Sequence, residues 1–189
     1  MKQLRLPIFN SKIKIYNLRI VPSDTIYNDV LHLKKQFEYL YGKQPLSGSK
    51  PHITLATFKM NSKYQEDLIQ VINQLSQKEA FKLKIDGFGV FEGSKTLYLN
   101  IAKNKTIETL NQEVKSLLNQ NLPKKLKKFF SSDIPHMTIS KTKGKKMLQE
   151  SLRHFQKTKY TREIEVGHLT LVSRSKYKTW DWEHRIELS

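Results

Sequence analysis

Cysteine is absent from the 189-residue chain, which excludes disulfides, thiolate metal ligands and a cysteine nucleophile. Long hydrophobic runs are absent too, since no stretch approaches the roughly 18 apolar residues of a membrane-spanning helix. The opening residues 1–7 lack the roughly 7–15 consecutive apolar residues of a secretion signal. Hydrophobic residues still make up 38% of the chain, which is enough for an ordered core. We therefore expect a soluble, cytoplasmic, monomeric protein with one domain over residues 1–189 and no membrane partner.

Acidic residues are scarce beside basic ones. The chain has 17 Asp and Glu against 34 Lys and Arg, which gives a formal net charge of +17. The densest basic segments are 124–128 and 141–146, and neither has the pattern of a long amphipathic membrane helix. A field of this sign attracts polyanions. Nucleic acid is therefore the favoured partner, while the alternative for any single lysine is a solvated surface position.

The spacing of apolar residues predicts an alternation of strands and helices. The segment between about 119 and 134 is basic and is interpreted as a loop. The predicted strands are 13–21, 52–59, 81–91, 96–102, 134–141, 160–173 and 179–188, and the predicted helices are 23–42, 63–77, 106–119 and 145–155.

Both halves of the chain show the same order of elements: strand, helix, a strand with the motif Pro-His-x-Thr, helix, strand. The halves span about 11–92 and 95–188, and Gly87 and Gly167 lie 80 positions apart in them. We interpret this order as an old duplication. It predicts an α+β fold with two interleaved lobes related by an approximate two-fold axis. Two antiparallel sheets would line a central cleft, with the helices outside.

The doubled motif carries the chemistry. It occurs as Pro-His-Ile-Thr at 51–54 and as Pro-His-Met-Thr at 135–138, with the histidines 84 positions apart. On a strand, residues i and i+2 point to the same face, so each copy places an imidazole beside a hydroxyl and turns the residue between them into the core. One His-x-Thr is expected by chance in a chain with six histidines, but two copies in matching positions, each preceded by proline, are not.

Two lobes that face each other would bring the two imidazoles to one point. Opening a cyclic phosphodiester requires a proton taken from the attacking water and another given to the leaving ribose oxygen. Histidine, with an ordinary pKa of about 6.5, can do either near neutral pH, and the sequence leaves open which histidine is the base. The threonine hydroxyls can donate to the non-bridging phosphate oxygens. The predicted catalytic residues are His52, Thr54, His136 and Thr138.

No cofactor is expected. No grouping of His, Asp and Glu in the sequence has the spacing of a metal site. A cyclic phosphate is already strained and contains its own leaving group, so the two imidazoles suffice for the predicted reaction.

The doubled motif resembles the two-histidine (2H) phosphoesterase superfamily, and is most similar to the LigT-like RNA 2′,3′-cyclic phosphodiesterases, also called 2′-5′ RNA ligases. The similarity extends to the opening strand that ends in Val21-Pro22, to Phe-Gly-Val-Phe at 88–91, to Leu-Tyr-Leu at 97–99 and to Leu-Thr-Leu at 169–171. It implies a bilobal LigT-like fold. It also implies a metal-independent enzyme that opens 2′,3′-cyclic phosphates on RNA ends to 2′-phosphates.

The resemblance also suggests substrate-binding residues. Many such enzymes carry an arginine three positions after the second threonine, where this chain has Lys141, with Thr57 at the matching first position. Lysine supplies charge but no bidentate fork. Tyr16 lies where the family often has an aromatic that could stack on a base, and Arg174 and Tyr177 follow a strand on the cleft side. The alternatives are an ordinary strand aromatic for Tyr16 and a simple turn for the other two.

Two further functions stay open. The same machinery could act as a 2′-5′ RNA ligase, or as a phosphodiesterase on 2′-5′-linked oligonucleotides or a small cyclic nucleotide. The net charge favours polymeric RNA over a small nucleotide. Alternatively, the chain could bind RNA ends without turning them over, which is suggested by the lysine excess and by Lys141.

Overall fold

A computed structural model describes residues 12–189 of the chain. Residues 1–11, which include the segment predicted to lack a secretion signal, lie outside the described part. Across residues 12–189, no helix is both long enough and apolar enough to span a membrane.

The described residues form nine strands and four α-helices. The strands are β1 (Ile13–Ile20), β2 (Ile53–Asn61), β3 (Phe81–Phe91), β4 (Thr96–Ile101), β5 (Lys127–Phe130), β6 (His136–Lys141), β7 (Thr161–Val166), β8 (His168–Arg174) and β9 (Trp182–Glu187). The helices are α1 (Asp24–Tyr41), α2 (Gln65–Ile72), α3 (Lys105–Asn121) and α4 (Lys145–Phe155), with 3-10 turns η1 (Ser62–Tyr64) and η2 (Asn73–Gln77) beside α2.

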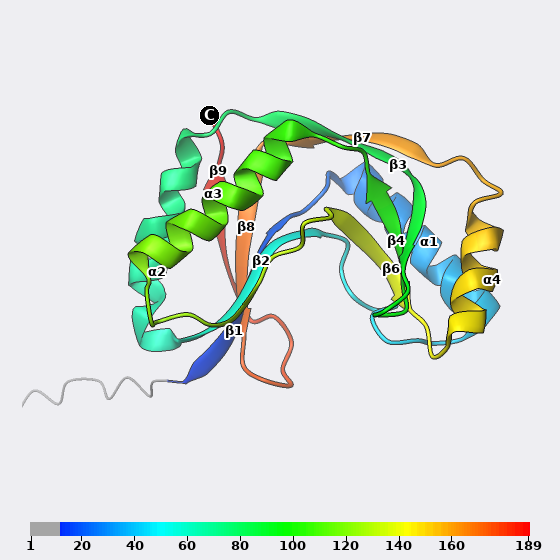
Figure 1. Cartoon of the computed structure of the whole chain (residues 1–189), viewed down its shortest axis with the longest axis horizontal. Helices are drawn as coiled ribbons and strands as arrows, with labels where there is room; N and C mark the ends of the chain where they lie inside the picture. Colours follow the sequence, from blue (N-terminus) through cyan, green and yellow to red (C-terminus); the bar gives the residue numbers. More distant parts are fainter. Residues whose placement is uncertain (1–11) are drawn as a thin grey trace, which may run out of the picture.

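All nine strands belong to one curled antiparallel sheet, in the order β7-β3-β4-β6-β2-β1-β8-β9, with β5 paired to β2 (Figure 1). The prediction of two sheets is therefore wrong. The two motif strands β2 and β6 pair with each other, with Ile53 opposite Met137, and this pair joins the inner edges of the two halves. Both side chains have no exposed surface, so the junction is held from the core side by apolar contact.

The sheet order is symmetric about the β6–β2 junction and exchanges strands between the two halves of the chain. The closing strand of the first half, β3, pairs with β4, while β8 of the second half pairs with β1. Neither half of the chain could therefore complete its part of the sheet alone. The duplication itself stays a prediction.

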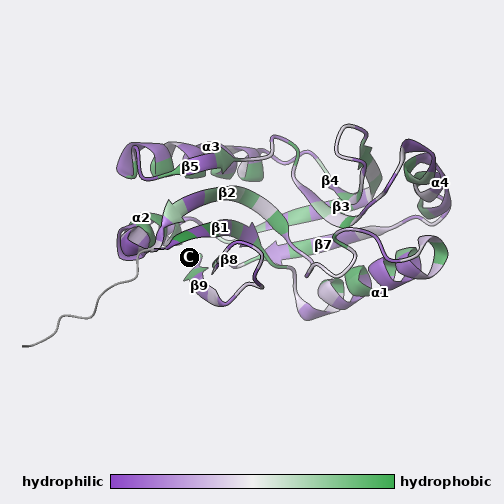
Figure 2. Ribbon diagram, turned by 90° about the horizontal axis from the view of Figure 1, so that it is seen from below, coloured by the Kyte–Doolittle hydropathy of each residue, from purple (hydrophilic) through white to green (hydrophobic). Residues whose placement is uncertain are grey.

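The helices cover the side of the sheet opposite the motif side chains. Figure 1 shows α2 and α3 at one end of the molecule and α1 and α4 at the other. Helix α3 contacts β2, while α1 contacts β6 and α4 contacts β3 and β4. Figure 2 shows both apolar and hydrophilic faces on these helices. In α1 the buried residues Ile26, Val30 and Phe37 follow helical spacing, and Gly42, at φ 71°, ends the helix in a conformation that favours glycine.

Strand β5 lies within the segment that was interpreted as a basic loop. Phe130 in β5 pairs with Thr57 in β2, at a part of β2 beyond its contact with β6. The four residues of β5 begin with two lysines and show little apolar alternation, so the sequence gives no local strand signal. The strand forms because β2 is longer than its pairing with β6 and leaves an edge to be filled.

Candidate active site

The pairing of β2 with β6 brings the two motifs together. Ile53 and Met137 face each other and have no exposed surface, as predicted for the residue between histidine and threonine. Strand alternation therefore turns the flanking residues of each motif to the opposite side, which we call the histidine face. The side chains that define the histidine face are His52, Thr54, His136 and Thr138.

The antiparallel register sets these four side chains in a square. With Ile53 opposite Met137, His52 neighbours Thr138 and Thr54 neighbours His136. The two imidazoles therefore occupy one diagonal, with their Cβ atoms roughly 7–8 Å apart, and the hydroxyls occupy the other. This spacing leaves room for a phosphoryl group between the ring nitrogens.

Each imidazole is held by the same local contact. Nδ1 of His52 lies 2.7 Å from the carbonyl oxygen of Lys50, and Nδ1 of His136 lies 2.9 Å from that of Ile134. A carbonyl oxygen only accepts, so in both rings Nδ1 carries the proton and Nε2 is left as the acceptor. The proline between carbonyl and histidine has a fixed φ of about −65°, which limits the backbone freedom of this short segment. The doubled proline of the motif thus fits a role in orienting the ring.

Both imidazoles are shifted toward their neutral form. Burial, together with the positive charges of Arg19, Lys34 and His136, lowers the pKa of His52 to about 4, against the hydrogen bond to Lys50. Burial also lowers the pKa of His136 from its ordinary value. In the free protein near pH 7 each Nε2 can therefore accept a proton.

A β-bulge follows the threonine in both motif strands. The register of β2 against β1 skips Leu55, and the register of β6 against β4 skips Ile139. An extra residue reverses the alternation beyond it, so the third residue after each threonine returns to the histidine face. These residues are Thr57 and Lys141. Without the bulge Lys141 would point to the core; with it, the predicted phosphate contact lies on the same face as His136.

Arg19 and Asn17 are site residues that the sequence reasoning missed. Arg19 lies directly opposite Thr54 on β1 and is only 4% exposed. Its Nε donates to Oδ1 of Asn17 at 2.7 Å, and Nδ2 of Asn17 donates to the Thr57 hydroxyl at 2.7 Å. The sequence did contain a signal for them: in the predicted strand 13–21, the polar Asn17 and Arg19 alternate with apolar residues.

Tyr16, predicted as a base-stacking residue, faces the core instead. Its side chain has no exposed surface, its ring stacks on Phe58 at 5.6 Å, and its hydroxyl donates to Oε1 of Gln65 at 3.1 Å. Burial raises the pKa of Tyr16 to about 12. This prediction needs correction, because a ring with no accessible face cannot stack on a base.

An aromatic wall stands beside His136. The rings of Phe91 and Tyr98 stack at 4.2 Å, and the His136 ring lies 4.7 Å from Phe91 and 5.2 Å from Tyr98. Gly89 makes this possible, because a Cβ there would lie 2.7 Å from the Tyr98 ring. The histidine face is therefore aromatic near His136 and cationic near His52.

A cavity of about 830 Å³ adjoins His52, and Arg174 lies on its wall with Arg19 and Trp180. Tyr177, the other candidate after β8, is 85% exposed and is not among the lining residues. The structure thus brings Arg174 to the site and leaves Tyr177 outside the cavity.

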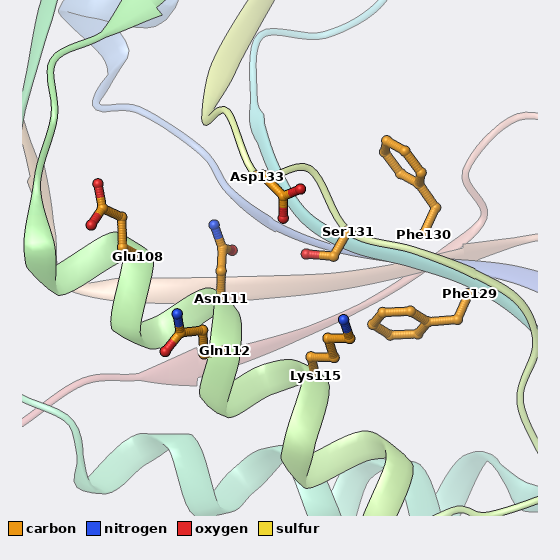
Figure 3. Close-up of a pocket in the computed structure, with 8 residues that line it drawn as sticks. All are labelled: Glu108, Asn111, Gln112, Lys115, Phe129, Phe130, Ser131 and Asp133. Carbon is orange, nitrogen blue, oxygen red and sulfur yellow. The ribbon is translucent and has the colours of Figure 1, made fainter.

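A second cavity, of about 680 Å³, lies between α3 and the segment around β5 (Figure 3). Glu108, Gln112 and Lys115 project into it from α3, opposite Phe129 and Asp133. Its wall contains no imidazole, unlike the histidine face. Across residues 12–189, no three or more His, Asp or Glu side chains gather as metal ligands would.

Residues 22–178 match the model of a protein family described as the 2′-5′ RNA ligase superfamily. The chain belongs to this superfamily. The resemblance to 2H phosphoesterases, inferred from the doubled motif, is thus confirmed at the level of the family. No curated protein sequence gives a match to the chain.

Solved structures with a similar fold come from several sources. Escherichia coli LigT complexed with 3′-AMP has a TM-score of 0.60 at 14% identity, covering 94% of this chain and 96% of LigT. The protein TT0787 of Thermus thermophilus has a TM-score of 0.66 at 13% identity, covering 92% and 98%. The PDE domain of MHV ns2 has a TM-score of 0.57 at 13% identity, covering 86% and 99%. At these identities the similarity establishes a LigT-like α+β fold.

Proposed function

We propose that this superfamily member hydrolyses 2′,3′-cyclic phosphates at RNA ends to 2′-phosphates, with His52 and His136 as the acid and base pair. The observation that carries the proposal is the diagonal placement of two imidazoles, each with Nδ1 held by a backbone carbonyl. Such a pair has two basic Nε2 atoms on one face and needs no metal to move protons.

The reaction requires two proton transfers on opposite sides of the phosphorus. One neutral imidazole takes a proton from water at Nε2 as the water oxygen bonds to phosphorus. The bond from phosphorus to O3′ breaks, and the second imidazole, in its protonated form, gives its Nε2 proton to O3′. The 2′-phosphate product leaves, and the proton exchanges back through solvent. The negative charge of the bound cyclic phosphate raises the pKa of both imidazoles, which makes the protonated acid accessible near neutral pH.

The two threonines and Lys141 suit the non-bridging phosphate oxygens. Nδ2 of Asn17 donates to the Thr54 hydroxyl at 3.4 Å, so the hydroxyl proton of Thr54 stays free to point at substrate. Thr138 occupies the equivalent corner of the square, and Lys141 adds positive charge on the same face. Donors fixed in advance in this way stabilise charge that builds up in the transition state.

RNA is the favoured substrate class. The net charge of +17 attracts a polyanion, and the exposed side chain of Phe130 offers an aromatic surface of the kind on which the bases of single-stranded nucleic acids stack. The LigT structures of this fold were obtained with 3′-AMP, NADP+ and phosphate. A nucleotide ligand is therefore compatible with this architecture.

The test is an assay of RNA ending in a 2′,3′-cyclic phosphate against free cyclic nucleotides and 2′-5′-linked oligomers, with products identified. We expect a 2′-phosphate product and full activity in EDTA. His52→Ala and His136→Ala should each lower the rate by at least about 10²–10⁴-fold while the protein still unfolds cooperatively. Near-full activity in either variant would contradict the paired mechanism. Formation of 2′-5′ linkages from cleaved RNA would instead show that the same site runs in reverse.

A further inference from the structure

A cationic pocket adjoins His52 on the side away from His136. It is the cavity of about 830 Å³, formed by β1, the loop before β2, β8 and the turn between β8 and β9. Of the residues that line it, the proposed reaction uses only His52. Its charged side chains are Arg19, Lys50, Arg174 and Lys178, against the carboxylates of Asp181 and Glu183.

Arg19 lies in the pocket wall with part of its guanidinium unsatisfied. The residue is 4% exposed, its Nε donates to Asn17, and its Nη2 is buried with no hydrogen-bond partner among residues 12–189. Buried donors are nearly always paired, because a buried donor without a partner loses its hydrogen bonds to water and gains none in the protein. A ligand oxygen at this position would supply the missing acceptor.

The indole ring of Trp180 contacts the guanidiniums of both Arg19 and Arg174. Its ring centroid lies 4.6 Å from the Arg19 guanidinium carbon and 5.0 Å from that of Arg174. Nη1 of Arg174 donates to the carbonyl oxygen of Lys178 at 3.0 Å, while its Nε is buried without a partner among the described residues. Two guanidiniums with unused donors are thus fixed against one indole, which limits their freedom before any ligand arrives.

The carboxylates in the pocket do not neutralise these arginines. Asp181 pairs with Lys14 at 3.9 Å and is half exposed. Glu183 is exposed, and its charge raises the pKa of Arg19 against the effect of burial, but no ion pair joins it to Arg19 or Arg174 within residues 12–189. The pocket therefore keeps an excess of positive charge.

We propose that this pocket binds a second phosphate of the substrate, through the guanidinium groups of Arg19 and Arg174. The inference rests on the proposed function and adds a second contact to it, in which the internucleotide phosphate next to the cyclic end of the RNA occupies the pocket. Arg19 faces Thr54, and Thr54 neighbours His136, so Arg19 lies two strand spacings, or about 10 Å, from the strand of His136. The planar guanidinium fork matches phosphate oxygens better than an ammonium does.

The experiment compares two dinucleotides that differ only in the charge of the internal phosphate. One is adenylyl-adenosine with a 3′-phosphate, and the other has the same bases, riboses and 3′-phosphate with an uncharged methylphosphonate linkage. Neither carries a cyclic phosphate, so calorimetric titration of the full chain measures binding alone. We expect the wild-type protein to bind the charged dinucleotide about tenfold or more tightly.

Arg174→Gln should narrow this difference to about twofold, because one of the two guanidiniums is lost. Arg153→Gln is the matched control, since it removes the same charge from an exposed position in the last turn of α4 and should keep the tenfold difference. Arg19 is buried, so Arg19→Lys, which keeps the charge and removes the fork, is the second variant and should also narrow the difference.

Equal binding of the two dinucleotides by the wild-type protein would overturn the inference, whatever the catalytic rate. The inference would also be overturned if Arg153→Gln and Arg174→Gln reduced the difference in affinity between the two dinucleotides equally, because the effect would then reflect net charge. A preserved tenfold difference that depends on Arg174, in a protein that hydrolyses no cyclic phosphate, would support the pocket and contradict the proposed function.

Discussion

Thr54 and Thr138 offer a clean test of the square of side chains, because threonine and valine have nearly the same shape. Thr54→Val and Thr138→Val replace only the hydroxyl, by a methyl group, and valine is favoured in β-strands. If the hydroxyls donate to phosphate oxygens in the transition state, each variant should lose about 10²-fold in kcat with little change in KM.

Thr161→Val is the matched control for this measurement. Thr161 lies in the edge strand β7, away from the histidine face, and its buried hydroxyl oxygen has no partner among the described residues. It should keep full activity. A kcat loss in Thr161→Val as large as that in the motif variants would mean that the threonines act through folding and not through the phosphate.

At the residue scale the sequence predicted what depends on local alternation. The two His-x-Thr pairs and their buried middle residues follow from the period of a strand. Whether Tyr16 or Arg19 faces the motif side chains does not follow from this alternation, because β1 is covered on both faces. The core side of β1 is the one that carries Tyr16, Leu18 and Ile20. Only the partner strands decide which face of β1 meets the motif, and those contacts come from distant parts of the chain.

Among the elements, the pairing of β3 with β4 depends on the absence of one side chain. A Cβ at Gly89 would lie 2.7 Å from the Tyr98 ring, which packs beside His136. Gly89→Ala should therefore displace the ring and destabilise the protein by about 1–3 kcal/mol, measured by urea unfolding. Gly93→Ala, where nothing lies within 4 Å of the new Cβ, should change stability by much less. Equal effects of the two would show that Tyr98 moves aside without cost.

Lys34 connects three elements around the site. Its Nζ donates to the carbonyl oxygens of Leu46 and Ile139 and to the Ser49 hydroxyl, so it joins α1, the loop that leads to His52, and β6. The side chain is 2% exposed, and burial lowers the pKa of Lys34 to about 8. Lys34→Met keeps the apolar stem and leaves these acceptors unpaired.

We expect Lys34→Met to loosen the loop at residues 43–51, with faster proteolysis there and about a tenfold loss of activity as His52 becomes less well positioned. The exposed neighbour Lys35 provides the control, since Lys35→Met should leave both readouts unchanged. Normal protease resistance and activity in Lys34→Met would show that Lys34 has no role in positioning His52.

The sequence predicted most elements but not how they assemble. Helix α4 and strand β3 have the predicted bounds, because their apolar spacing and flanking residues are local signals. The single sheet was missed because the pairing of Ile53 with Met137 joins residues far apart in the chain. The bulges at Leu55 and Ile139 were missed for the same reason, since both arise from register against a neighbouring strand.

For the whole molecule, one sheet rather than two changes how the site is built. The square of side chains on the histidine face is formed by two adjacent strands at the centre of a continuous sheet, not by two lobes that face each other across a gap. Each half of the chain supplies one imidazole, and strands of the two halves also pair at β3 with β4 and at β8 with β1. The site is therefore expected to be lost in the same cooperative transition as the core, because neither half holds a complete sheet without the other.

Because the site and the core are expected to unfold together, the pH dependence of the global stability reports the pKa values of the two histidines. Folding lowers the pKa of His52 to about 4 and that of His136 below its ordinary value, so the unfolded chain binds protons more readily than the folded one. Stability should be unaffected by these groups above about pH 6.5 and should fall as the pH drops from about 6.5 towards 4. In urea unfolding at a series of pH values, His52→Gln should lose less stability across this window than the wild type, and carboxylates that titrate there cancel in the comparison. Identical pH dependence of the two proteins would mean that His52 is solvated, and that its Nε2 does not start the reaction from a buried neutral ring.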